Sequence, residues 1–323
     1  MNRYLKTALL MALALMLALS PVLAGAEAAQ PVEIIDSLGR AVTIESVPER
    51  IVSMSPSNTE ILYALGAGDR VVGVDTYSDY PEEAAALESK VGTYTEPNVE
   101  LIVSLEPDIV FADNNLQQDT IDQLESLGVT VVSVTGTTYD DVPEAIELVA
   151  QCIGADATQV LADMEATRQQ ALALVNGDES KTVYYALSFG EYGDWTSGEG
   201  TFADDMINML GATNVGAELG QGWLSISLEK LLEADPDVIL IPGDETMVES
   251  FKSDASYAEL SAVKNGAVYA VDMNMSQRPG PRLAQALLEF AQILYPDQGA
   301  ADGADAATDA TGAETAATEA PAA

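Results

Sequence analysis

One strand–helix unit that occurs twice constrains the fold of this chain more than any other feature. Residues 98–110 (NVELIVSLEPDIV) and 227–239 (SLEKLLEADPDVI) each combine an amphipathic segment with a Pro-Asp pair and the start of an apolar run. In both copies the Pro-Asp pair begins seven residues after a glutamate, Glu100 in the first and Glu229 in the second. We therefore infer duplication of one structural unit, because a generic helix followed by a proline turn would rarely keep this spacing by chance.

Short apolar runs alternate with helix-like segments on both sides of this repeat. Strands that alternate with helices predict a mainly parallel sheet with helices on both faces. The sequence thus predicts an α/β fold with two Rossmann-like lobes, one over residues 31–155 and one over residues 180–296. The predicted strands are residues 51–54, 70–74, 107–112, 129–134, 182–187, 237–241 and 267–271, and the predicted helices are residues 61–65, 98–105, 119–127, 202–210 and 228–233.

A single long linker helix is predicted between the lobes, over residues 156–177. Residues 156–175 contain neither proline nor glycine and are rich in alanine, leucine, glutamine and glutamate, which are strong helix formers. At about 1.5 Å per residue, such a helix spans about 30 Å. It would join the lobes rigidly, unlike a linker rich in glycine and serine.

The two ends of the chain are predicted to lie outside the fold. Residues 1–26 begin with Arg3 and Lys6, continue with an apolar run and end in small residues, which is typical of a secretory signal peptide. The run is shorter than the ~20 residues that span a bilayer, so cleavage is favoured over anchoring. No cysteine follows it, so the lipobox of a bacterial lipoprotein is missing and a periplasmic or extracytoplasmic location is expected. The composition of residues 297–323 predicts a disordered acidic tail.

The composition excludes several classes of function. The chain has no histidine, which excludes a Ser-His-Asp triad and an HExxH zinc site. With 52 acidic against 13 basic residues, no nucleic-acid partner is expected. We expect no catalytic residue, no metal site and no intrinsic cofactor. The enzymatic alternative is a secreted hydrolase that uses Ser55 or Ser57, or the carboxylates Asp75 and Asp79, but no GxSxG, SxxK, P-loop or dinucleotide fingerprint supports it.

Aromatic side chains gather in the loops that follow the predicted strands. Ligands of open α/β sheets bind outside the carboxyl ends of the strands, so these loops are expected to face one another across a cleft. The rings suit stacking on a large, flat or amphipathic ligand, and their polar, glycine-rich surroundings favour this role over core packing. Gln277 and Arg278 add a polar pair at the same rim. The loop aromatics are Tyr77, Tyr80, Tyr94, Phe189, Tyr192, Trp195 and Trp223.

Three segments resemble one known family. Residues 51–60 (IVSMSPSNTE), 72–81 (VGVDTYSDYP) and 92–101 (GTYTEPNVEL) are similar to the periplasmic substrate-binding proteins of iron-siderophore and vitamin B12 ABC importers, most of all to the vitamin B12 branch. The resemblance covers about residues 32–296. It implies two α/β lobes joined by one long helix, no enzymatic activity, and a receptor that delivers its ligand to a membrane permease.

The same resemblance implies roles for individual residues. The transported ligand would be a corrinoid such as cobalamin, although Tyr94 stands where the vitamin B12 branch has a tryptophan and Gln277 where it has an acid. Glu100 and Glu229 match two glutamates that dock onto arginines of the dimeric permease. The residues implied to line the corrinoid cleft are Pro56, Tyr77, Tyr94, Trp195, Trp223, Gln277 and Arg278.

The identity of the ligand stays open between a corrinoid and two alternatives of the same family, a ferric siderophore and haem. Ferric siderophores are often anionic and call for several arginines, whereas the predicted cleft loops hold only Arg278, with Arg282 nearby. Haem is disfavoured by the lack of histidine, although tyrosine can ligate iron. Cobalamin brings its own lower axial base, so its receptor need supply no histidine. The receptor is expected to act as a monomer.

Overall fold

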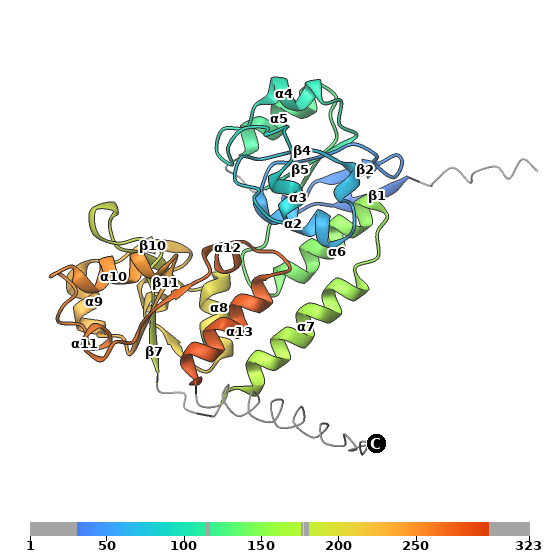
Figure 1. Cartoon of the computed structure of the whole chain (residues 1–323). Helices are drawn as coiled ribbons and strands as arrows, with labels where there is room; N and C mark the ends of the chain where they lie inside the picture. The colour runs from blue at the N-terminus through green and yellow to red at the C-terminus, as the bar shows by residue number, and fades with distance from the viewer. Residues whose placement is uncertain (1–30, 114–116, 176, 178–180, 297–323) are drawn as a thin grey trace, which may run out of the picture.

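A computed structural model describes residues 31–113, 117–175, 177 and 181–296 of the 323-residue chain. It has two α/β lobes joined by the long helix α7 (Thr158–Ala173), as predicted (Figure 1). The predicted signal peptide and acidic tail lie outside the described residues. Within the described ranges, every helix is too short or too polar to traverse a lipid bilayer.

Each lobe is built on a four-stranded parallel sheet. The N-terminal sheet has the order β4-β3-β5-β6 and the C-terminal sheet the order β9-β7-β11-β12, and all neighbours are parallel. Counted along the chain, both orders read 2-1-3-4, so the topology repeats as the sequence does. The strands are β3 (Ile51–Ser53), β4 (Val71–Val74), β5 (Ile109–Ala112), β6 (Val131–Ser133), β7 (Thr182–Tyr185), β9 (Thr213–Asn214), β11 (Val238–Pro242) and β12 (Val268–Val271).

Alternate strand residues feed two hydrophobic layers, one on each face of a sheet. Phe111 packs on the face covered by α2 and α6, whereas Val110 packs on the face covered by α4 and α5. In the C-terminal lobe, Tyr185 faces α8 and α13, and Tyr184 faces α9, α10 and α11. This is the geometry of strands buried on both faces. The helices are α2 (Pro56–Ala64), α4 (Val99–Ser104), α5 (Gln118–Ser126), α6 (Asp141–Ile153), α8 (Phe202–Met209), α9 (Leu228–Ala234), α10 (Glu245–Ser253), α11 (Ser261–Asn265) and α13 (Leu283–Leu294).

The sequence repeat forms the same helix cap and the same strand-to-strand hydrogen bond in both lobes. Asn98 caps α4 and Ser227 caps α9, each by accepting a hydrogen bond from the backbone three residues on. The aspartate of each Pro-Asp pair then ties the third strand to the first. Asp108 Oδ2 accepts from the backbone N–H just before β3 at 2.9 Å, and Asp237 Oδ2 accepts from the first N–H of β7 at 2.8 Å. The Pro-Asp pair therefore recurs because each sheet needs this tie.

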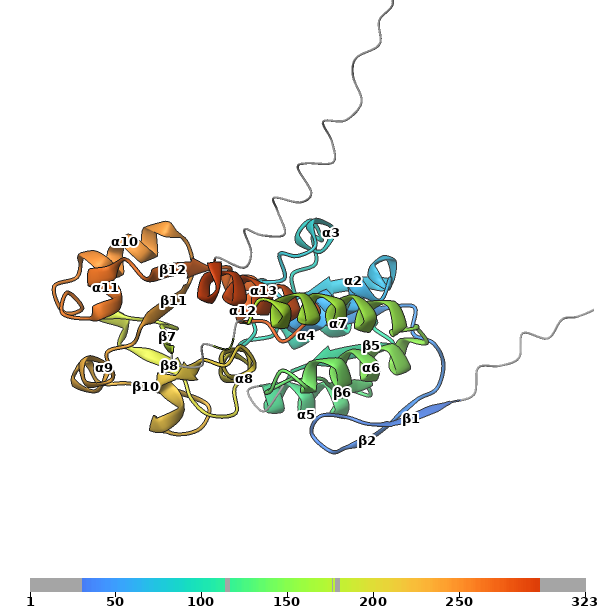
Figure 2. The ribbon, with the colours of Figure 1, turned by 90° about the horizontal axis from the view of Figure 1, so that it is seen from below.

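One hydrophobic core runs through both lobes and the connector. The layer between α2 and α6 and the layer between α8 and α13 belong to a single cluster of buried residues, which also includes Met164, Ala171 and Leu174 of the connector segment. Helix α7 packs along α13 (Figure 2) and, at about 1.5 Å per residue, spans about 24 Å. The lobes are therefore joined by packed side chains and not by a flexible hinge.

One antiparallel hairpin and one antiparallel pair of distant strands were not predicted. β1 (Val32–Ile35) pairs with β2 (Ala41–Ile44) at the outer edge of the N-terminal lobe (Figure 2), and β8 (Trp195–Ser197) pairs with β10 (Trp223–Ser225) in the C-terminal lobe. Strands of three or four residues carry too little periodicity to stand out from loops. The remaining short elements are η1 (Gly68–Arg70), α3 (Glu82–Ala85), η3 (Gly190–Tyr192), η4 (Val215–Leu219) and α12 (Met273–Ser276).

Candidate ligand-binding cleft

A cavity of about 600 Å³ lies between the two lobes. Its lining comes from segments that directly follow strands: Ser55 follows β3, Asp113 follows β5 and Met273 follows β12. The cavity is thus at the carboxyl ends of both sheets, where ligands of such folds bind. Six of the seven residues expected to line the cleft are among its lining residues, namely Pro56, Tyr77, Tyr94, Trp223, Gln277 and Arg278.

The first turn of α2 forms part of the N-terminal wall. Ser55 is the N-cap, with its Oγ accepting from Asn58 N at 3.3 Å, and Pro56 follows at the helix start, where an N–H is not needed. The side chain of Asn58 donates to Ala112 O at 3.0 Å and to Val134 O at 3.3 Å. These bonds hold the ends of β5 and β6 against the helix, so Pro56 reaches the cavity on a rigid turn.

Trp223 forms the aromatic part of the C-terminal wall. Its ring centroid lies 5.4 Å from that of Phe202 at the start of α8 and 6.0 Å from that of Tyr185 at the end of β7. These contacts fix the indole, yet 37% of the residue stays exposed. A ring that is held on one side and open on the other can stack on a planar ligand with little loss of side-chain freedom.

The other loop aromatics lie in different surroundings. Trp195 stands on the neighbouring strand β8 and is not among the cavity-lining residues, although it is 42% exposed. Phe189 packs edge-on against Phe251, with centroids 5.1 Å apart, at the core of the C-terminal lobe. Tyr80 lies against the guanidinium of Arg282. A position in a loop after a strand is therefore not enough to predict whether an aromatic ring faces the cavity.

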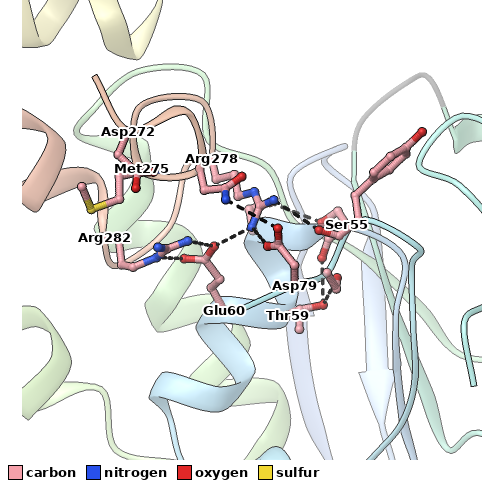
Figure 3. A network of polar contacts seen from close by, with 12 residues as sticks. Ser55, Thr59, Glu60, Asp79, Asp272, Met275, Arg278 and Arg282 are labelled. Carbon is pink, nitrogen blue, oxygen red and sulfur yellow. Dashed lines mark hydrogen bonds and ion pairs between the residues drawn. The ribbon is translucent and has the colours of Figure 1, made fainter. Parts of the chain in front are cut away.

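Arg278 lines the cavity with its charge already paired. Its Nη1 donates to Glu60 Oε1 at 3.2 Å and to Asp79 Oδ1 at 2.6 Å, and its Nη2 donates to Tyr77 O at 3.2 Å (Figure 3). Partial burial of Asp79 would raise the pKa of its carboxyl, but the bond and charge of Arg278 hold that pKa below its usual value. The positive charge at this rim is thus balanced by the protein itself.

A chain of buried polar groups, which sequence reasoning missed, lies behind the cavity wall. Thr59 Oγ1 donates to Ser53 Oγ at 2.8 Å and lies 2.8 Å from Ser78 Oγ, which donates to Asp75 Oδ1. Burial raises the pKa of Asp75, and the bond from Ser78 offsets part of that rise. Single serines and threonines form no sequence motif, so only their coming together in the fold reveals this chain.

Glu100 and Glu229 stand in the first turns of α4 and α9, and both are exposed. The repeat places them at equivalent positions, one on each lobe, on helices that lie far from α7 (Figure 1). Neither residue lines the cavity. A carboxylate is favoured in the first turn of any helix, so the equivalence between the lobes is what distinguishes this pair.

Comparison with known proteins decides the family. Residues 51–274, more than half of the chain, match the family described as periplasmic binding protein. This chain belongs to the periplasmic binding protein family. The binding protein is 36% identical over 276 residues to an uncharacterized ABC transporter substrate-binding lipoprotein, YvrC, of Bacillus subtilis, covering 83% of this chain and 86% of that one.

Two further relatives carry a ligand in their names. A cobalamin-binding protein of Halobacterium salinarum is 30% identical to this binding protein over 279 residues, covering 82% of this chain and 74% of the relative. The solved apo structure of the periplasmic heme-binding protein RhuT from Roseiflexus is 29% identical and superposes with a TM-score of 0.68, covering 77% of this chain and 99% of that one.

Family membership fixes the class of function. This periplasmic binding protein is a non-catalytic, extracytoplasmic substrate-binding protein of an ABC importer, and an importer implies a membrane permease as partner. The hydrolase alternative is therefore excluded. In agreement, Ser55 and Ser57 share a hydrogen bond at 3.3 Å in the turn that caps α2, and Asp75 is buried behind the wall.

Proposed function

We propose that this receptor binds a corrinoid, cobalamin or a relative, in the cavity between its lobes and delivers it to the permease. The observation that carries the proposal is the ring of Trp223, which is fixed by Phe202 and left open to the cavity. Tyr77 and Tyr94 line the cavity from the other lobe, so a flat ligand would meet aromatic groups from both sides. The cobalamin-binding relative from Halobacterium salinarum supports the same class of ligand.

The charge of the lining favours a ligand without strong negative charge. Arg278 is the one lysine or arginine among the described cavity-lining residues, and Glu60 and Asp79 already balance it. An anionic ferric siderophore would bring uncompensated negative charge into this site. We assign Pro56, Gln277 and Arg278 to the rim that shapes the cavity, and Trp195 to support of strand β10, which carries Trp223.

Haem is the second candidate ligand. Tyr77 and Tyr94 bring phenol groups to the cavity, and phenolate is a known ligand of haem iron. A solved relative is named as a heme-binding protein. Because the chain has no histidine, we assign the ligation of a haem iron held here to one of these two tyrosines.

Delivery is proposed to use Glu100 and Glu229. A pair of exposed carboxylates at equivalent positions can meet basic groups of a two-fold symmetric permease and fix the orientation of docking. We further propose that residues 1–26 are a cleaved signal peptide and that the receptor acts as a monomer. Its units would be the lobes at 31–155 and 180–296, the linker at 156–177 and the acidic tail at 297–323.

Calorimetric titration of the purified protein with four ligands tests the ligand assignment. Cyanocobalamin and cobinamide are expected to bind with one-to-one stoichiometry, and haem and a ferric hydroxamate siderophore far more weakly. Tight siderophore binding without heat from either corrinoid would refute the assignment. Tight haem binding that is lost in Tyr77→Phe or Tyr94→Phe would establish the second candidate.

A further inference from the structure

A buried ion cluster joins the two lobes beside the cavity. Glu60 belongs to α2 of the N-terminal lobe and has a side chain only 2% exposed, whereas Arg278 and Arg282 come from the segment between α12 and α13 of the C-terminal lobe. Arg282 donates from Nε to Glu60 Oε2 at 2.8 Å and from Nη2 to Oε1 at 2.6 Å, which is a bidentate pair. Arg278 adds a third bond to the same carboxylate (Figure 3).

Residues 77–80 of the N-terminal lobe close the cluster from outside. Asp79 accepts from Arg278 at 2.6 Å. The ring centroid of Tyr80 lies 3.8 Å from Cζ of Arg282, close enough for a cation–π interaction. We call Glu60, Asp79, Tyr80, Arg278 and Arg282 the interlobe latch.

The latch separates two hollows of the molecule. Arg278 lines the 600 Å³ cavity between the lobes. Glu60, Tyr80 and Arg282 line a second cavity of about 890 Å³, which is bounded by α2, α7 and α13. The latch is therefore the partition that bridges the lobes along one edge of the 600 Å³ cavity.

The carboxylate of Glu60 is the most buried charge of the interlobe latch, and both arginines pair with it. The side chains of Arg278 and Arg282 are 13% and 14% exposed. Water therefore solvates the three charges little, and they are stabilised mainly by pairing with one another. Moving the lobes apart would leave a buried charge without its partners, which is strongly unfavourable until water enters. These contacts therefore favour the paired, dry arrangement of the lobes.

We propose that Glu60 is a positioning residue that sets the separation of the lobes, and that the latch must break before bound ligand can leave. The first part concerns the geometry of the lobes and holds for any ligand. The second part rests on the proposed function, because it takes the cavity between the lobes as the ligand site. In this proposal Arg278 holds the rim of the cavity in place. Because its charge is paired within the protein, it attracts a charged ligand only weakly.

Distances between spin labels on the two lobes test the first part without ligand. Labels at Gln123→Cys on α5 and Ser250→Cys on α10 occupy exposed positions on different lobes. The native Cys152 is buried, which raises the pKa of its thiol to about 12 and keeps it from competing for the label. Glu60→Gln is expected to lengthen and broaden the distance distribution relative to the parent protein.

Glu125→Gln is the matched control, because Glu125 pairs with Arg40 at 2.7 Å inside the N-terminal lobe. It should leave the distances unchanged. If Glu60→Gln does not fold, Asp79→Asn is the second variant. It removes only the ion pair of Arg278 with Asp79, whose side chain is 54% exposed. We expect it to lengthen the distances by a smaller amount. An unchanged distribution in folded Glu60→Gln, or in Asp79→Asn where the first variant is unfolded, overturns the proposal.

Release of cyanocobalamin tests the second part. Glu60→Gln is expected to speed dissociation at least tenfold while Glu125→Gln leaves it unchanged; equal rates in the two variants would overturn this part. Failure of cyanocobalamin to bind the parent protein would count against the proposed function, whereas the distances measured without ligand would still decide whether the latch sets the lobe separation.

Discussion

At the scale of single residues, Trp223 and Trp195 stand on paired strands, β10 and β8, but only Trp223 lines the cavity. Trp223→Ala is expected to weaken cyanocobalamin binding by roughly 1–3 kcal/mol, the usual range for loss of a stacking ring. Trp195→Ala removes a ring that supports the strand pair without lining the cavity, so its loss of affinity should be smaller. Calorimetry on both variants measures the difference, and equal losses would mean that the strand pair matters only as a whole.

Asp36 is a buried residue whose ionisation should matter for stability in acid. Its buried carboxylate accepts hydrogen bonds from the backbone N–H of Leu38, Arg40 and Ser133 at 2.9 to 3.1 Å and pairs with the Arg40 guanidinium at 2.5 Å. Burial alone would raise the pKa of Asp36, but these bonds hold it below its usual value. The stabilisation is therefore complete above the unfolded-state pKa of about 3.9 and is lost as pH falls through the lower folded-state value.

Asp36→Asn is thus expected to cost about 1.5–3 kcal/mol of unfolding free energy near neutral pH, because it removes charge-assisted hydrogen bonds and leaves Arg40 with Glu125 alone. Urea denaturation between pH 7 and pH 3 measures this. The gap between the parent protein and the variant should narrow at the acid end. A gap that stays constant with pH would show that ionisation of Asp36 does not carry the effect.

At the scale of elements, the repeated α4–β5 and α9–β11 units share a strained residue at the same position. Glu106 after α4 has a φ of 48° and Asp235 after α9 a φ of 40°, both in the left-handed region. At Asp235, two side-chain hydrogen bonds offset this backbone strain. Its Oδ1 accepts from Ser261 N and its Oδ2 accepts from Ser261 Oγ, both at 2.7 Å.

Glycine substitution should separate the two positions. Glu106→Gly is expected to stabilise the protein by up to about 1 kcal/mol by removing left-handed strain. Asp235→Gly is expected to destabilise it, because it also removes the two bonds to Ser261. Thermal denaturation of both variants decides this, and a destabilised Glu106→Gly would show that the entropy lost by glycine on folding exceeds the strain that is relieved.

The sequence analysis predicted the elements around the repeat and missed both those that depend on distant partners and the regular helices α6, α10 and α13. The strands and helices around the repeat carry their period and their capping residues locally, so their succession along the chain and the parallel sheets could be predicted. The antiparallel pairing of β8 with β10 could not, because these strands are three residues long, lie among glycines and are separated along the chain by α8 and β9. The pairing of Glu60 with Arg282 joins residues 222 positions apart, and among 52 acidic residues nothing local distinguishes Glu60.

At the scale of the whole molecule, one core shared by both lobes and α7 supports a receptor whose site is largely preformed. We propose that the exposed carboxylates Glu100 and Glu229, at equivalent positions on the two lobes, dock onto the permease. Glu100→Ala combined with Glu229→Ala is expected to abolish delivery to the permease and leave ligand affinity unchanged. Uptake and calorimetry measure the two quantities separately, and a loss of affinity would assign these residues to the site or the fold.

The place where the ligand binds can be measured by hydrogen exchange with and without cyanocobalamin. Binding between the lobes predicts slower exchange in the first turn of α2, at residues 135–137, at Trp223 and at residues 277–278, which surround the 600 Å³ cavity. Protection confined to α7 and α13 around the second cavity, or no protection at saturating cyanocobalamin, would contradict a corrinoid receptor with its site between the lobes.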